Sequence, residues 1–180
     1  MSETGLIPLG GPLQALAEWL SGTWLNHVAT HYVWVWPAME TIHFLALGLL
    51  VGTIGALDLR LIGVARQLPL APFQRLVPWG VAAFVINAIT GVVFFAGAPF
   101  QYIYNFAFQM KVLLMLIAGL NIFVFYAGGI SRRIFAVGPG GRVPLAGRVT
   151  GVVSLAVWIG VMYWGRMLTF YRPPWVFPPP

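Results

Sequence analysis

The sequence predicts an all-α membrane protein, a bundle of four transmembrane helices preceded by an amphipathic helix at the membrane surface. Hydrophobic residues make up 59% of the 180 residues and charged residues only 8%, whereas soluble domains carry about a quarter charged residues. Four apolar stretches, at residues 33–57, 77–98, 106–127 and 149–170, are each near the length of about 20 residues that a spanning helix needs. Proline and glycine interrupt the chain between them, as expected at helix ends.

The N-terminal segment, residues 1–32, is too polar to span a bilayer but rich in aromatic residues. Leu13, Leu16, Leu20 and Trp24 form an apolar stripe at helical spacing, which predicts a helix lying in the outer interface. Residues 33–171 form the predicted transmembrane domain. The proline-rich residues 172–180 predict an extended tail.

The distribution of basic residues predicts the orientation of the four spans. Seven of the ten Lys and Arg residues lie in the first and third gaps: Arg60, Arg66, Arg75, Arg132, Arg133, Arg142 and Arg148. Because cytoplasmic loops are enriched in these residues, both termini are expected on the periplasmic side of a bacterial inner membrane. Since the basic residues follow the gaps between spans, we expect the lipid bilayer as a partner and no nucleic acid.

Ionisable residues inside spans are costly and therefore indicate sites. Glu40 and His43 share a face of the first span, while Lys111 and Arg166 lie about one turn inside the third and fourth spans. These residues predict a cofactor site near the outer face, with His43 as a b-type haem ligand or a quinone hydrogen-bond partner. Lys111 and Arg166 would then contact propionates or a head group. The alternative is that Glu40 pairs with Lys111 or Arg166 and only locks the bundle.

A haem at His43 would need a sixth ligand or remain five-coordinate. The candidates are Met110, Met115, Met162, His27 and His31. His27 and His31 are four residues apart and would share a helix face, but two ligands do not make a metal site.

Other polar residues and glycines predict structural roles. Asp58 and Arg60 mark the predicted exit of the first span, as a cap and a cytoplasmic anchor. Asn87 and Asn121 are mid-membrane amides that are expected to bond to neighbouring helices, with Asn121 also a candidate cofactor contact. Close helix approach is expected at five glycines: Gly48, Gly52, Gly55, Gly151 and Gly160.

Four stretches resemble an uncharacterised bacterial family of four-helix membrane proteins, a domain of unknown function. They are WPAMETIHFLALGLLVGTIGALDLRLIG, PWGVAAFVINAITGVVFF, FQMKVLLMLIAGLN and WIGVMYWGRMLTFY, which cover most of the chain from Trp36 onward. The matching positions are His43, Asp58, Arg60, Lys111, Asn121 and Arg166. A histidine in the first span and a lysine opening the third are more distantly similar to copper-resistance D proteins and membrane-type protoporphyrinogen oxidases. That similarity implies a haem or a metal.

The function expected from these observations is that of an accessory or structural subunit of a larger membrane complex, supporting a haem or quinone near the outer face. Two alternatives remain open, a haem- or quinone-binding electron-transfer protein and a copper or small-solute permease. The sequence contains no HExxH, P-loop or nucleophile motif. We therefore expect no catalytic activity of its own.

Overall fold

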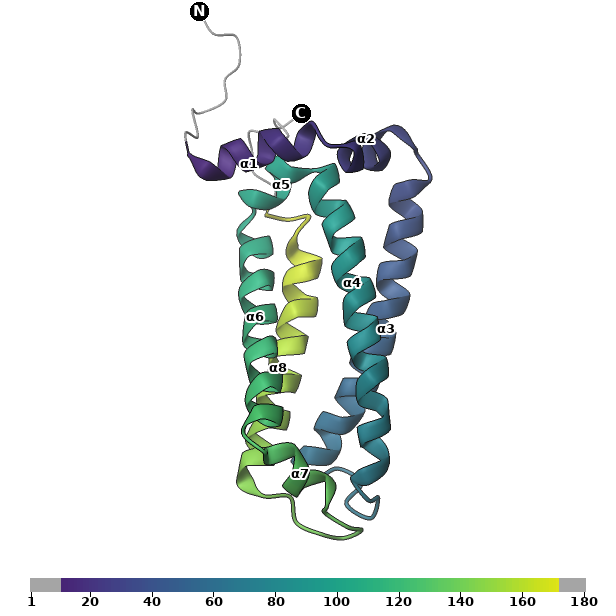
Figure 1. The fold of residues 1–180 in the computed structure, drawn as a ribbon, viewed down its shortest axis with the longest axis vertical. Coiled ribbons are helices and arrows are strands. Elements are labelled where there is room, and N and C mark those ends of the chain that lie inside the picture. Colours follow the sequence, from purple (N-terminus) through teal and green to yellow (C-terminus); the bar gives the residue numbers. More distant parts are fainter. Residues whose placement is uncertain (1–10, 172–180) are drawn as a thin grey trace, which may run out of the picture.

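The computed structural model describes residues 11–171, and the predicted tail at 172–180 lies outside them. Four long helices run up and down in alternating directions: α3 (Val35–Ile62), α4 (Val77–Gly97), α6 (Phe106–Ala127) and α8 (Leu145–Met167) (Figure 1). Each is long and apolar enough to cross a membrane. The predicted all-helical architecture with four candidate spans is therefore confirmed, and the fold is that of a multi-pass membrane protein.

The boundaries of the first and last spans differ from the prediction. Helix α3 continues through Asp58 and Arg60 to Ile62 and ends where Gly63 adopts a left-handed conformation with a φ of 115°. Helix α8 begins at Leu145 rather than at residue 149. The two charged residues do not end α3, because the fold buries both of them inside the bundle.

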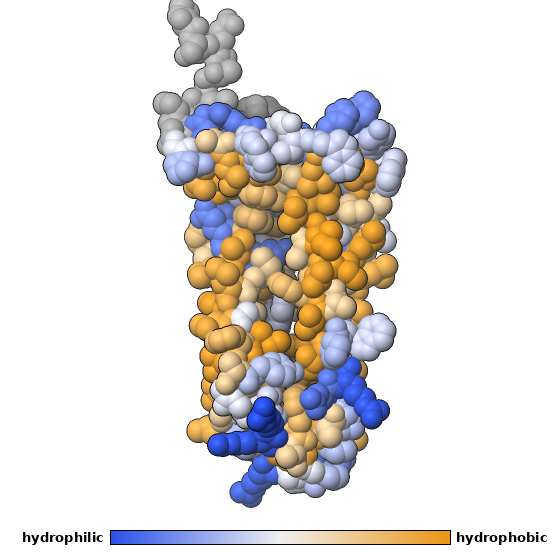
Figure 2. All heavy atoms as spheres, in the orientation of Figure 1, coloured by the Kyte–Doolittle hydropathy of each residue, from blue (hydrophilic) through white to orange (hydrophobic). Residues whose placement is uncertain are grey.

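The helices pack as two antiparallel pairs, α3 with α4 and α6 with α8, which are joined by contacts between α3 and α8. The backbones of α4 and α6 stand apart, and the two helices meet through side chains such as Phe95 and Phe108, whose rings stack with centroids 5.5 Å apart. Figure 2 shows a hollow on this face of the molecule, between the two pairs. The bundle is therefore closed on one side and open on the other.

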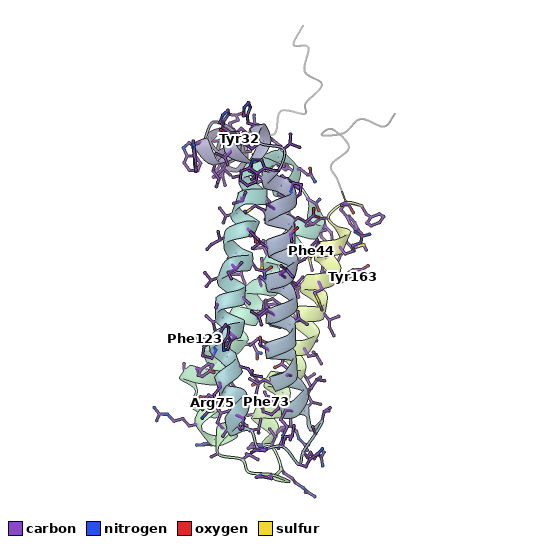
Figure 3. The ribbon with its side chains drawn as sticks, turned by 90° about the vertical axis from the view of Figure 1, so that its right-hand side faces the viewer. Tyr32, Phe44, Phe73, Arg75, Phe123 and Tyr163 are labelled. Carbon is purple, nitrogen blue, oxygen red and sulfur yellow. The ribbon has the colours of Figure 1, made fainter. Side chains whose placement is uncertain are left out.

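The outer surface of the bundle is apolar along its middle and more polar at both ends (Figure 2). Exposed aromatic side chains include Phe44, Phe123 and Tyr163, labelled in Figure 3 on α3, α6 and α8. Arg75 extends from one end of the bundle, and Tyr32 lies at the other. A continuous apolar belt of this kind suits contact with lipid chains.

One end of the bundle carries α1 (Pro12–Ser21), α2 (Trp24–His31) and α5 (Pro99–Ile103) (Figure 1). The predicted single amphipathic helix is two helices, because the Thr23 hydroxyl accepts a hydrogen bond from the Asn26 backbone N–H and starts a new helix. The predicted stripe is divided between them, and Leu13, Leu16 and Trp24 are exposed.

Helices α1 and α2 are docked on the bundle through small residues. Ala17 and Ala29 are buried, and the Asn26 side chain donates to the Ala96 carbonyl at the end of α4 over 2.7 Å. This end of the molecule is therefore an assembled cap.

The opposite end carries a short 3₁₀ helix (Ala71–Leu76) and α7 (Ile130–Phe135). Its core is a cluster of buried apolar side chains: Leu57, Leu61, Leu70, Phe125, Ile134 and Val143. This cluster joins α3, α6 and α7 to the loops at their ends.

Glycines set the closest approach between α3 and α8. A Cβ atom on Gly151 would lie 2.9 Å from the Leu61 Cβ and 3.0 Å from the Asp58 carbonyl oxygen, so only glycine fits there. Gly160 lies against Leu114 of α6, as a helix contact requires. Close approach was wrongly predicted for Gly48, Gly52 and Gly55, where an added Cβ would meet nothing within 4 Å.

Candidate functional site

The four ionisable residues predicted to form an outer site lie in one half of the bundle. Helices α3 and α6 begin, and α8 ends, at the end that carries α1, α2 and α5 (Figure 1). Glu40, His43, Lys111 and Arg166 are all within a few turns of those helix ends. Their common depth is therefore as the helix positions predict.

His43 is fixed by a hydrogen bond to α4. Its Nδ1 lies 2.7 Å from the Thr90 hydroxyl oxygen, and the Thr90 hydroxyl itself donates to the Ile86 carbonyl at 2.9 Å. Because the Thr90 hydroxyl has one proton, His43 Nδ1 is the donor in the tautomer that leaves this proton on a carbonyl and the acceptor in the other. The ring also contacts Phe94 edge-on, with the ring centroids 5.6 Å apart.

The remaining predicted residues do not converge on His43 by direct bonds. The Lys111 Nζ lies near Gly165 on α8, 3.9 Å from where a Cβ atom on that glycine would stand. Glu40 and Arg166 are exposed, and among residues 11–171 neither forms an ion pair. The locking pair of Glu40 with Lys111 or Arg166 is thus not formed in this conformation.

A metal centre finds little support in this half. His27 and His31 stack on each other on α2, with ring centroids 4.9 Å apart. In the described part of the chain, no three His, Cys, Asp or Glu side chains are grouped so that they could hold a metal ion. Haem ligation by His43 stays a prediction.

A cavity of about 280 Å³ lies in the other half of the bundle, between the two helix pairs. All four long helices contribute to its wall, and most of the lining is apolar. The polar or aromatic side chains of the wall are Asp58 on α3, Phe84 on α4, Asn121, Phe125 and Tyr126 on α6, and Thr150, Ser154 and Trp158 on α8. Concave apolar sites with a few polar groups are typical of small-molecule binding.

Asp58 is the acidic residue in the wall of this cavity. The residue is 3% exposed, and it also lines a second cavity of about 50 Å³ that lies against Trp158 and Met162. Ser154 on α8 lies close enough to its carboxyl group to interact with it. The Oδ2 atom is buried without a partner. Asp58 is thus an interior polar group, whereas the sequence predicts a cap at the end of the span.

Arg60 is buried on another side of α3 from Asp58, as a spacing of two residues requires. Its side chain is 1% exposed and donates from Nε to the Leu68 carbonyl at 2.7 Å and from Nη2 to the Arg66 carbonyl at 3.1 Å. The guanidinium therefore closes the loop that follows α3. The cytoplasmic anchoring that the sequence assigns to Arg60 stays a prediction.

The two mid-membrane amides behave differently. Asn121 donates from Nδ2 to the Thr150 carbonyl at 3.2 Å, so it bonds α6 to α8 as predicted, and both residues line the large cavity. Asn87 donates to the Ala83 carbonyl of its own helix at 3.1 Å, so the expected bond to a neighbouring helix does not form. Asn121 and Met115, the latter predicted as a possible sixth haem ligand, are the predicted cofactor residues in the wall of the cavity.

Phe84 and Trp158 bring aromatic rings from α4 and α8 together at the cavity wall. Their centroids are 6.2 Å apart, with the planes at 73°. Phe84 was not a sequence candidate, because nothing in an apolar span distinguishes a lining phenylalanine from a lipid-facing one.

Asn105 is a structural residue that the sequence predictions missed. It is fully buried, its Oδ1 accepts hydrogen bonds from the backbone of Ala107 and Phe108, and its Nδ2 donates to the Leu168 carbonyl at 2.9 Å. An asparagine directly before an apolar run is a helix N-cap signal, so the first of these roles was available in the sequence.

Comparison with known proteins gives no match: no protein-family model, no curated protein and no solved structure matches the chain.

Proposed function

We propose that this chain is a non-catalytic membrane protein that binds a lipid-soluble small molecule in the cavity between its two helix pairs. The observation that carries the proposal is the cavity itself, about 280 Å³, walled by all four long helices and containing a buried carboxyl group. Concave, mostly apolar sites with a few polar groups are typical of small-molecule binding. A space of this size at the junction of two helix pairs suits an occupant.

The occupant would enter from the bilayer. The backbones of α4 and α6 stand apart, and residues of both helices line the cavity. Both helices expose apolar residues to lipid, among them Val81 on α4 and Ile122 on α6, which also line the cavity. A lipid-soluble molecule can therefore reach the cavity without crossing a polar surface.

This proposal changes the place of the predicted ligand. The sequence favours a haem or quinone near His43, whereas the cavity lies in the α7 half, and the residues of its wall include no histidine. A quinone-sized ring is compatible with the volume. A haem on His43 would require a separate site in the other half.

Isothermal titration with 4-phenylbutan-1-ol, on the full chain purified in a mild detergent, tests the proposal. Gly119 lines the cavity and has no atom within 4 Å of an added Cβ, so Gly119→Phe places a ring there without a backbone clash. Gly52→Phe is the matched control, because Gly52 is exposed, has equally open space and lies outside the lining. We expect binding to fall at least tenfold in Gly119→Phe only. Equal binding by the chain and both variants would overturn the proposal.

A second candidate function, a subunit of a larger membrane complex, is favoured by α6. Little of this helix is buried, and large apolar side chains cover its free face, including Leu116, Leu120 and Phe123. Photo-crosslinking from position 120 in native membranes tests this function. A discrete cross-linked protein would support it, and labelling of lipid alone would contradict it.

A further inference from the structure

We infer that the cavity selects a lipophilic cation, an amine or quaternary ammonium group on an apolar or aromatic body, whose positive charge pairs with Asp58. The inference rests on the proposed binding function and names the class of ligand. Three properties of the wall lead to it: the sign of its charge, the state of its hydrogen-bonding groups and its aromatic content.

The wall of the cavity is acidic. Asp58 is present, and the lining residues include no Lys, Arg or His. Arg60, the nearest basic residue along α3, donates to the loop carbonyls of Leu68 and Arg66 and forms no bond to Asp58. An electroneutral bound state therefore requires either a proton on Asp58 or a cation from the ligand.

Two donors of the wall are occupied, while one buried acceptor is free. Asn121 donates to the Thr150 carbonyl, and the Thr150 hydroxyl donates to the Ala146 carbonyl at 3.0 Å. By contrast, Asp58 Oδ2 is buried and has no partner. Leaving such an acceptor unpaired is costly, and more so if it is charged. A ligand that donates a hydrogen bond or carries positive charge removes this cost.

Aromatic rings stand beside the carboxyl group. Trp158 lines both cavities together with Asp58, and Phe84 meets it across the wall. The negative faces of such rings attract cations, and Trp does so most strongly. A carboxylate next to aromatic rings in an apolar cavity therefore favours an organic ammonium over a neutral or anionic molecule of the same shape.

A neutral acceptor such as a quinone fits this pattern less well. Its carbonyl oxygens need donors, and the lining side chains whose N–H or O–H groups form no hydrogen bond within residues 11–171 are Trp158, Tyr126 and Ser154. Tyr126 is 41% exposed, whereas Asp58 is buried. While Asp58 is ionised, its Oδ2 atom would remain unpaired on binding a quinone.

Three probes with one skeleton separate these possibilities: 4-phenylbutylammonium, 4-phenylbutan-1-ol and 4-phenylbutanoate. Calorimetry on the full chain in neutral detergent should show the ammonium binding at least tenfold more tightly than the alcohol, and the carboxylate least tightly. Asp58→Asn should remove the preference for the ammonium. Glu40→Gln is the matched control, an acid-to-amide change on the same helix at an exposed position, and should leave the preference unchanged.

A chemical experiment on the unmutated chain covers the case in which Asp58→Asn does not fold. Dicyclohexylcarbodiimide adds to carboxyl groups in apolar surroundings and leaves its whole mass on the residue, which peptide mass spectrometry can locate. We expect trimethyl(4-phenylbutyl)ammonium, which has no N–H that could couple to the activated carboxyl group, to protect Asp58 and not Glu40, and 4-phenylbutan-1-ol to protect neither at the same concentration.

The outcomes distinguish the inference from the function on which it rests. If the ammonium and the alcohol bind equally well and Gly119→Phe weakens both, the cavity binds ligands without selecting a cation, and the inference is wrong while the proposed function stands. If neither probe binds, or Gly119→Phe has no effect, both are wrong. Labelling of Asp58 that is unaffected by trimethyl(4-phenylbutyl)ammonium would also overturn the inference.

Discussion

The two halves of the bundle use buried polar groups in opposite ways. In the half capped by α1, α2 and α5, buried amides such as Asn105 are bonded to backbone atoms, and His43 is bonded to Thr90. In the α7 half, Asp58 and Arg60 are almost fully buried, and each retains an unpartnered atom beside an apolar core. Polar groups that have hydrogen-bond partners hold helices and loops together, whereas a polar group without a partner next to a cavity is available to a ligand. The comparison therefore places architecture in one half and the candidate site in the other.

The largest effect is expected from Arg60→Ala, which tests whether the α7 half depends on its buried charge. The change removes both hydrogen bonds to the loop and leaves two carbonyls unpaired, so we expect a loss of about 3 kcal/mol in the free energy of unfolding. Unfolding in mixed micelles of increasing dodecyl sulfate measures it. Arg75→Ala is the control at an exposed position and should change stability by less than about 0.5 kcal/mol. Similar losses in the two variants would contradict a specific role for Arg60.

Gly151→Ala tests the contact that joins the two helix pairs in the α7 half. The added methyl group meets the Leu61 Cβ and the Asp58 carbonyl, and overpacking of this kind costs about 2 kcal/mol. The same unfolding assay applies. In Gly52→Ala the methyl group has open space, so stability should stay the same or rise slightly. A neutral Gly151→Ala would show that α3 and α8 move apart easily.

Asn105 provides the matching test in the other half. Asn105→Ala removes the α6 N-cap and the bond to Leu168, and we expect a loss of about 1 to 2 kcal/mol. Asn105→Asp keeps an acceptor for the cap but cannot donate to Leu168, so it should recover part of this loss. If both variants lose the same amount, the link to α8 matters and the cap does not.

The smallest effect is expected from Thr90→Val, which removes the bond between α3 and α4 at His43. Interhelical hydrogen bonds in membranes contribute about 0.6 kcal/mol on average, and we expect a loss of that order. Thr41→Val is the control, because the Thr41 hydroxyl bonds only to the Pro37 carbonyl of its own helix. In ¹⁵N spectra, the His43 Nδ1 resonance should shift in Thr90→Val and stay unchanged in Thr41→Val. No shift in Thr90→Val would show that the bond does not form.

The predictions from sequence succeeded where one-dimensional patterns decide the structure. Apolar length located the four long helices, and α4 and α6 begin at the predicted residues. The same reasoning ended α3 too early, because a charged residue near the end of an apolar run looks like a boundary whether its side chain faces water or the interior. It also joined α1 and α2 into one helix, since the stripe of leucines continues across the break that Thr23 makes.

The candidate site was less accessible to the sequence. His43 and Lys111 attract attention because polar residues are rare in spans, and the structure places both in the half that helix positions predict. The cavity depends on which helix backbones stand apart when the bundle is packed. Nothing in residues 77–97 or 106–127 shows that α4 and α6 stand apart, and so nothing shows that Asp58 lies beside a space.

The sequence by itself determined that the long helices suit an apolar environment, where they lie along the chain and how few polar side chains they carry. Apolar length and composition are local properties of the chain. Only the tertiary structure decided which of those polar groups are satisfied. Asp58, Ser154 and Asn121 come from three helices and meet at one cavity, and their hydrogen-bonding state follows from the pairing of α3 with α8 and of α6 with α8. Whether a polar group has a hydrogen-bond partner depends on where the helices lie relative to one another. The spacing of residues along one helix cannot specify it.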